Sequence, residues 1–192
     1  MELLFILLTY FVASIPFGFI VGKLSGKDIT KEGRGNIGAT NVVRTIGKKA
    51  GIFVLLLDAL KGFIPVYISK IYFDDLIVAV VAVVAVFGHC YSIFMKFKGG
   101  KGVATGIGVL IALSPKVALI TITLWLGIFL TTGYVFLASV ISAFLSWIMM
   151  TYIESNYYYT IAALISSMII VYKHSSNIER FLKGTESRFI YK

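Results

Sequence analysis

The sequence predicts an all-α, polytopic membrane protein with seven transmembrane helices, one or two of them short. Of its 192 residues, 58% are hydrophobic and only 14% are charged, and the mean hydropathy is +0.91. A soluble domain of this size carries about 45–50% apolar and about 25% charged residues. The apolar residues also gather in blocks that suit bilayer-crossing helices, which need about 20 apolar residues each. No linker-like segment interrupts these blocks, so residues 1–192 are expected to form one domain.

Seven spans follow from six apolar blocks. The longest block, 103–131, exceeds the length of one span and contains Ser114-Pro115-Lys116, a turn signal that carries a charge. Divided there, the block gives two helices, of which 103–113 is short enough to begin deep in the membrane. The predicted spans cover residues 3–22, 50–73, 76–95, 103–113, 117–131, 134–153 and 157–172.

The positive charges lie on one side of this layout. The formal net charge is +9, and segments 23–49, 96–101 and 173–192 hold fifteen of the eighteen lysines and arginines. With seven spans and the N-terminus outside, all three segments face the cytoplasm, as the positive-inside rule requires. The sequence therefore predicts a cytoplasmic C-terminus.

The first basic segment contains the glycine-rich stretch 33–41, followed by Arg44. Its GxGxxG spacing is formally that of a dinucleotide site, with Asp58 at the distance of a ribose-binding acid. That interpretation is excluded, because the flanks are membrane helices and not a βαβ unit. Backbone N–H groups freed by glycines still favour an anion site over a merely flexible linker. The predicted phosphate-binding residues are Gly35, Asn36, Gly38, Thr40 and Asn41, with Arg44 as a charged donor.

The second basic segment reads Lys96-Phe97-Lys98-Gly99-Gly100-Lys101-Gly102-Val103-Ala104-Thr105. Its spacing is not that of a Walker A motif. A basic turn at the end of a span would explain the lysines, but not three glycines around Lys101 at the start of a predicted helix. We therefore expect phosphate binding by Gly99, Gly100, Gly102 and Thr105 around Lys101.

Histidines and intramembrane charges complete the candidates. His174 and Asn177 follow the last span at a spacing that places both on one helix face, and His174-x4-Glu179 is a weak match to an acyltransferase His-x4-Asp pair. A lone histidine at a membrane exit is equally often only an interfacial donor. Asp58 and Lys61 are i, i+3 within one span, where mutual neutralisation is favoured over a catalytic role.

A stripe of serines, at positions 139, 142 and 146, is typical of close helix packing, although Ser139 lies near enough to the cytoplasmic end to contact a ligand. Two histidines and one cysteine offer no metal-ligand spacing, so we expect no metal. Nucleic-acid binding is not expected either, because the cations lie in glycine loops at a membrane face.

Together these motifs resemble the PlsY family of bacterial acyl-phosphate:glycerol-3-phosphate acyltransferases. The stretches that carry the resemblance are Ser14-Ile15-Pro16-Phe17-Gly18, residues 35–44, Gly88-His89, residues 96–105 and residues 174–186. The resemblance implies acyl transfer from acyl phosphate to the 1-hydroxyl of sn-glycerol 3-phosphate, giving 1-acyl-glycerol 3-phosphate (lysophosphatidate) and phosphate. It also implies a multi-pass protein of the bacterial inner membrane, with a cytoplasmic active site and no cofactor. The oligomeric state stays open, with a monomer among the options.

The resulting hypothesis gives catalytic roles to Arg44 and Lys101 as the main charges, His174 and Asn177 as groups that orient glycerol 3-phosphate, and Ser139 as a hydroxyl contact. Supporting roles are assigned to Arg34, Asp58, Lys61, His89 and Glu186. The proton of the attacking hydroxyl goes either to His174 or to a phosphate oxygen of the donor. The second route is favoured, because nearby cations are expected to lower the pKa of His174 modestly.

Three positions depart from the family pattern. Arg34 stands where the family usually has serine, and either contacts phosphate itself or is tolerated. Ser92 replaces a common proline, and Phe136 replaces another serine. The competing hypothesis, a transporter or channel for an organic phosphate, requires basic groups near the bilayer midplane, where only Lys61 is expected.

Overall fold

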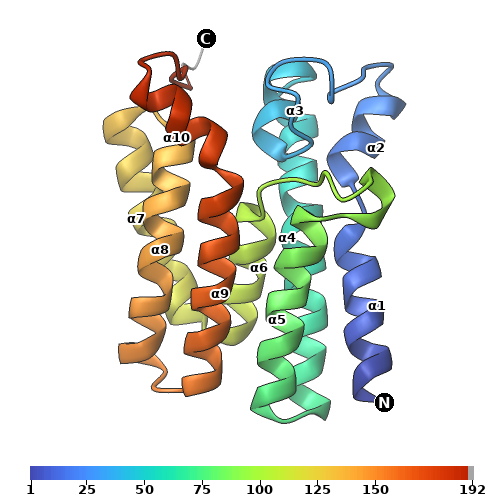
Figure 1. Cartoon of the computed structure of the whole chain (residues 1–192), viewed down its shortest axis with the longest axis vertical. Helices are drawn as coiled ribbons and strands as arrows, with labels where there is room; N and C mark the ends of the chain where they lie inside the picture. The colour runs from blue at the N-terminus through green and yellow to red at the C-terminus, as the bar shows by residue number, and fades with distance from the viewer. Residues whose placement is uncertain (190–192) are drawn as a thin grey trace.

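The computed structural model describes residues 1–189, which are helical with connecting turns and contain no strand. Figure 1 shows most of the helices running up and down side by side in one bundle. Lys192, counted above with the basic tail, lies outside the described residues. The helices are α1 (Glu2–Ser14), α2 (Phe17–Leu24), α3 (Ala39–Thr45), α4 (Lys48–Tyr72), α5 (Asp75–Cys90), α6 (Val103–Leu113), α7 (Pro115–Thr132), α8 (Val135–Ile153), α9 (Tyr157–Lys173) and α10 (Ser175–Leu182), with a 3-10 turn η1 (Ile93–Met95).

Five stretches in this range are long and apolar enough to cross a membrane. They are Glu2–Leu24, Lys48–Tyr72, Asp75–Met95, Pro115–Thr132 and Val135–Ile153. Helix α6 is apolar but only 11 residues long, as the division at Ser114 predicted. Helix α9 has 17 residues and begins with three tyrosines, so it is less apolar than α6. The prediction of an all-helical fold with several apolar helices is confirmed.

The first predicted span, 3–22, lies within the apolar stretch Glu2–Leu24, but it consists of two helices. The break falls at Ile15-Pro16, where proline has no N–H to continue the ladder of helical hydrogen bonds. Carbonyl groups left open at the end of α1 find partners from elsewhere in the chain. Ser92 Oγ donates to the Ser14 carbonyl at 2.5 Å, and Lys61 Nζ donates to the Ile15 carbonyl at 2.7 Å. The break is thereby tied to α4 and to the end of α5.

The three basic segments meet at one end of the bundle. In Figure 1 the connection from α2 through α3 to α4, and the C-terminal α10, lie at the upper end, opposite the N-terminus. The α5–α6 connection runs below them, so α6 begins beneath the upper ends of its neighbours. This agrees with the expectation that 103–113 does not begin at the same level as the other helices.

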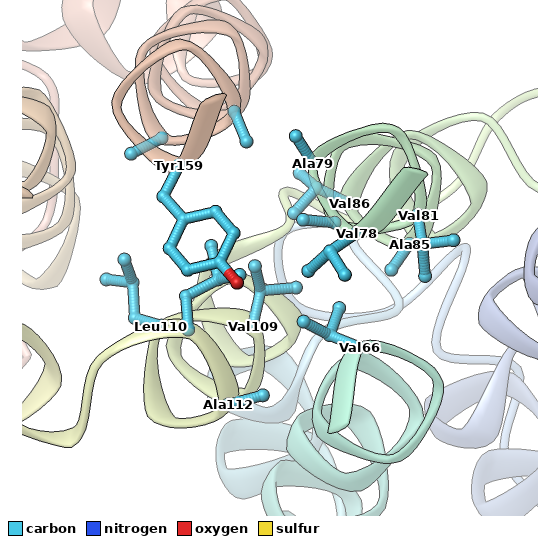
Figure 2. Packing of buried hydrophobic residues seen from close by; sticks show 14 of the residues in the cluster. Val66, Val78, Ala79, Val81, Ala85, Val86, Val109, Leu110, Ala112 and Tyr159 are labelled. Atoms are coloured by element: carbon cyan, nitrogen blue, oxygen red, sulfur yellow. The ribbon is translucent and has the colours of Figure 1, made fainter. Parts of the chain in front are cut away.

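Small side chains allow the central helices to pack closely. Figure 2 shows valines and alanines of α4, α5 and α6 meeting Tyr159 of α9. Helices α4 and α6 approach so closely that a Cβ at Gly108 would lie 1.9 Å from the Ala59 carbonyl oxygen. Such small-residue contacts are how membrane helices associate, because lipid supplies no hydrophobic driving force between them. Large apolar side chains instead cover the outer faces, including Leu4, Leu56 and Leu130.

Candidate active site

A partly open cavity of about 320 Å³ lies where the basic segments meet. It collects most of the residues that the sequence singled out. Among its lining residues are Arg34, Asn36, Gly38, Thr40, Asn41, Arg44, Asp58, His89, Lys101, Gly102, Ser139, His174, Asn177 and Glu186. Five predicted site residues are not among the lining residues: Gly35, Lys61, Gly99, Gly100 and Thr105.

The first glycine loop is held in shape by Asn41, whose side chain is buried. Its Oδ1 accepts the Arg34 N–H at 2.8 Å, and its Nδ2 donates to the Ile29 and Glu32 carbonyls at 3.0 and 3.1 Å. In this structure the amide bonds the loop itself, and its contact with phosphate stays a prediction. Asn36 has a similar task, since its Oδ1 accepts the Gly38 N–H at 2.7 Å at the start of α3.

Helix α2 supports this loop from below at Gly18. A Cβ at that position would lie 1.8 Å from the Ile37 carbonyl oxygen, so only glycine fits. The residues after the Pro16 break are thus in direct contact with the loop that carries Asn36 and Gly38. Thr40 and Arg44 extend from α3 into the cavity wall beside it.

The second glycine loop bonds the end of α5 through its backbone. Its Gly99 N–H donates to the Cys90 carbonyl at 3.2 Å, and its Gly100 N–H donates to the His89 carbonyl at 3.0 Å. In this structure these N–H groups bond the end of α5, and phosphate binding at Gly99 and Gly100 stays a prediction. Thr105 is fully buried in α6. The loop's contribution to the cavity is Gly102 and, above all, Lys101.

Lys101 begins a chain of polar contacts that ends on α10. Its Nζ donates to Asn177 Oδ1, and Asn177 Nδ2 donates to Glu186 Oε1 at 2.8 Å. Arg180 Nε donates to the other Glu186 oxygen at 2.5 Å. Sequence reasoning missed Arg180, although its i, i+3 spacing from Asn177 was a readable signal.

Positive charges dominate the electrostatics of this row of polar contacts. Burial and, to a smaller extent, the positive charge of Arg180 together lower the pKa of Lys101 to about 8. Burial acts to raise the pKa of Glu186, but hydrogen bonds from Arg180 and Asn177 outweigh it and bring that pKa below its usual range. Burial and the neighbouring Arg34 lower the pKa of Arg44. The carboxylate therefore stays ionised among these cations, and Lys101 titrates close to neutral pH.

His174 lies at the junction of α9 and α10 and is buried. Its Nδ1 is 2.7 Å from the Ile170 carbonyl oxygen, which only accepts, so Nδ1 carries the proton and Nε2 is an acceptor. Burial, then Lys101, lowers the pKa of His174 to about 4, further than predicted from neighbouring cations alone. Glu179 is exposed and pairs with Lys183 at 2.6 Å, so the His174-x4-Glu179 spacing is not a dyad.

The wall opposite the loops combines one hydroxyl with aromatic side chains. Ser139 Oγ accepts from Trp125 Nε1 at 3.0 Å and donates to the Val135 carbonyl at 2.8 Å. Phe136, in place of a family serine, also lines the cavity, as does Phe129. This side of the cavity is therefore mainly apolar.

Asp58 and Lys61 form the ion pair that the sequence predicted. Lys61 Nζ lies 2.7 Å from Asp58 Oδ1, and both side chains are buried. His89 Nδ1 lies 3.6 Å from the same carboxylate oxygen. Asp58 and His89 line the cavity, whereas Lys61 is buried and is not among the lining residues.

After α10, Ser187 and Phe189 line the cavity beside Glu186, and the sequence analysis singled out only Glu186. Arg34 donates to Ser187 Oγ at 2.6 Å, and the Arg44 guanidinium lies 5.4 Å from the centre of the Phe189 ring. The Phe189 N–H donates to the Gly133 carbonyl at 2.8 Å. Residues 187–189 thus contact the first glycine loop at Arg34 and helix α3 at Arg44.

Comparison with known proteins agrees with these features. The sequence model of the family described as Glycerol-3-phosphate acyltransferase matches residues 3–184. A glycerol-3-phosphate acyltransferase of Aquifex aeolicus is 45% identical over 97% of this chain and 98% of that protein. One of Geobacter sulfurreducens is 44% identical over 98% of this chain and 97% of its own length.

Two crystal structures of PlsY (YgiH), an integral membrane glycerol 3-phosphate acyltransferase, have the same fold. The glycerol 3-phosphate form has a TM-score of 0.96 and 41% identity, and covers 98% of this chain and 96% of that one. The lysophosphatidic acid form has a TM-score of 0.93 and 41% identity, with coverage of 97% and 94%. The chain is accordingly a multi-pass membrane protein, and it belongs to the glycerol-3-phosphate acyltransferase family.

Proposed function

We propose that this chain transfers a fatty acyl group from acyl phosphate to the 1-hydroxyl of sn-glycerol 3-phosphate. Membership of the family supports the acceptor. The observation that carries the donor is the cavity, which is lined by Arg34, Arg44 and Lys101 and, on another part of its wall, by aromatic and aliphatic side chains. Arg180 adds a further positive charge through its hydrogen bond to Glu186. Two phosphate-bearing substrates require such an excess of positive charge, and an acyl chain requires an apolar wall.

The chemistry asks for positioning more than for a strong nucleophile. Acyl phosphate is an activated mixed anhydride, so the 1-hydroxyl oxygen forms a bond to the acyl carbon while the bond from that carbon to the phosphate oxygen breaks. Lys101 and Arg44 offset the charge on the departing phosphate. Asn177, fixed between Lys101 and Glu186, orients the acceptor.

His174 orients the attacking hydroxyl in this scheme, and a phosphate oxygen of the donor takes its proton. The unprotonated Nε2 accepts a hydrogen bond from the hydroxyl, because Nδ1 is committed to Ile170. A group with a pKa of about 4 is a poor base at neutral pH, which supports the substrate-assisted route over a general-base histidine.

We further propose seven spans in the bacterial inner membrane, with the N-terminus outside and the cavity on the cytoplasmic side. The gathering of the basic segments at one end supports this orientation. Cysteine labelling in intact cells tests it, since Cys90 is buried and gives little background. Ser155→Cys should react with an impermeant reagent from outside, whereas Lys98→Cys should react only after permeabilisation; the reverse result refutes the orientation.

The activity is tested with purified protein in detergent. Palmitoyl phosphate and glycerol 3-phosphate are supplied separately and together, and phosphate release should require both. Lys101→Met should abolish release, while Lys98→Met, which removes an exposed lysine of the same loop, should retain it. Uptake of glycerol 3-phosphate into liposomes without phosphate release would instead support the transporter.

A further inference from the structure

Three buried titratable side chains lie beneath the loop that carries Lys101, and the mechanism above uses none of them. Asp58 and Lys61 belong to α4, and His89 is the penultimate residue of α5. Their relative exposures are 2%, 4% and 4%. Burying an ion pair costs desolvation free energy that the attraction between the charges often does not recover, so these residues call for an explanation.

His89 contacts the glycine loop through both its backbone and its ring. Its carbonyl oxygen accepts the Gly100 N–H at 3.0 Å. Its imidazole lies against Gly100 so closely that a Cβ there would be 2.1 Å from Nε2, and a Cβ at Gly99 would be 2.1 Å from the His89 carbonyl oxygen. Gly99 and Gly100 therefore both pack directly against His89, and Lys101 is the next residue in the sequence.

The loop needs such support because its backbone is strained. Lys96 and Phe97 have φ angles of 51° and 62°, in the left-handed region that residues with side chains rarely occupy. Such conformations persist only where surrounding contacts hold them. The Phe97 N–H donates to the Ser92 carbonyl at 2.8 Å, and the contacts to His89 hold the following turn.

The position of His89 is in turn linked to the rest of the bundle. Its Nδ1 faces the Asp58 carboxylate, which pairs with Lys61, and Lys61 also donates to the Ile15 carbonyl at the Pro16 break. A continuous line of contacts thus runs from the break between α1 and α2, through α4 and α5, to the loop.

We propose that His89, held in place by Asp58, is a positioning residue for Lys101: its carbonyl and imidazole seat Gly99 and Gly100, and this fixes the direction in which Lys101 enters the cavity. Asp58 and Lys61 act through His89 and do not touch substrate. The proposal rests on the proposed function only in taking Lys101 as a phosphate-binding group. Failure of the wild-type protein to release phosphate would count against that function; the tests below compare variants with an active wild type.

A double-mutant cycle tests the contact. Gly100→Ala places a methyl group against the imidazole and should lower kcat/KM about 100-fold, the loss expected when a reacting group is displaced by about 1 Å. His89→Ala removes the obstacle, so the same Gly100→Ala change should then cost about threefold or less. Equal losses in the two backgrounds would overturn the proposal. Gly127→Ala, where a Cβ meets nothing within 4 Å, is the matched control.

The pH profile separates positioning from a general loss of folding. A loosened loop admits water to Lys101, so in His89→Ala the alkaline fall of kcat/KM should move from about pH 8 toward the ordinary lysine range, near pH 10. The charged and titratable groups that face Lys101 are Arg34, Arg44, His174, Arg180 and Glu186. None of these groups is changed in His89→Ala. Reduced activity with the alkaline fall of kcat/KM still at about pH 8 would refute the positioning role of His89.

Where His89→Ala does not fold, His89→Gln serves instead. Glutamine keeps a polar group and the backbone carbonyl but lacks the ring, so it should shift the alkaline limb in the same direction by a smaller amount. Folding is monitored by a single peak in size-exclusion chromatography in detergent. The combined change Asp58→Asn with Lys61→Met removes both buried charges, and it should move the limb as His89→Gln does. A double variant with the wild-type profile would refute the role of Asp58.

Discussion

The titration of Lys101 makes the most direct prediction, because one lysine supplies a main charge of the cavity. Its pKa is lowered to about 8 by burial and by the cations around it. The cation is the form that binds phosphate, and it is present below that pKa and lost above it. Since kcat/KM reports ionisations of the free enzyme, it should fall as pH rises through about 8.

The size of the effect follows from the protonated fraction. With a pKa of about 8, roughly nine-tenths of Lys101 is charged at pH 7 and roughly one-tenth at pH 9. We therefore expect kcat/KM to decrease about tenfold over that interval. In Lys101→Arg the guanidinium stays charged throughout this pH range, so the profile should be flat although its absolute level is lower.

The assay measures phosphate release from palmitoyl phosphate at low acceptor concentration between pH 6.5 and 9.5, with spontaneous hydrolysis subtracted at each pH. Lys98→Arg, in the same loop but exposed, should keep the wild-type shape. Constant kcat/KM up to pH 9.5, or a parallel decrease in Lys101→Arg, would show that another group controls the limb.

Three further predictions concern neighbouring contacts. Glu186→Gln removes the acceptor of the Asn177 amide and should lower kcat/KM about 10- to 100-fold, whereas Glu179→Gln, on an exposed ion pair, should change it less than about twofold; equal effects would contradict the role of the carboxylate. Gly18→Ala brings a methyl group to within 1.8 Å of the Ile37 carbonyl and should abolish most activity by displacing the first glycine loop, while Gly127→Ala should not; an active Gly18→Ala enzyme would refute the contact. His174, whose folded pKa of about 4 lies below its unfolded value of about 6.5, contributes stability that is complete above pH 6.5 and is lost as pH falls toward 4. Thermal unfolding in detergent should record up to about 3 kcal/mol of this loss in the wild type, and less in His174→Gln.

Local motifs allowed much of the fold and site to be predicted. Apolar block lengths gave the order of the helices, and the turn at Ser114-Pro115 correctly divided 103–131. Lys101, His174 and Asn177 were identified because glycines, charges and a histidine are conspicuous at membrane exits. The structure brings these residues to one cavity. Pro16 was a readable break signal that the assignment of one span over 3–22 passed over.

What could not be predicted depends on contacts between distant segments. The Gly99 and Gly100 N–H groups looked available for phosphate, but their partners on α5 are decided by how the loop folds back. The Asn41 side chain likewise looked available for phosphate, because only the folded loop brings the Ile29 carbonyl within reach of its amide. The contact of Arg34 with Ser187 joins residues 153 positions apart, and neither position has a local signature that names the other.

The position of residues 187–189 has a practical consequence for work with this protein. Ser187 and Phe189 line the cavity, so a bulky label attached to this segment would lie against the cavity wall. Met1 is fully exposed at the opposite end of the bundle (Figure 1). Spectroscopic labels therefore belong near Met1, and assays on protein labelled within 187–189 should be repeated without the label.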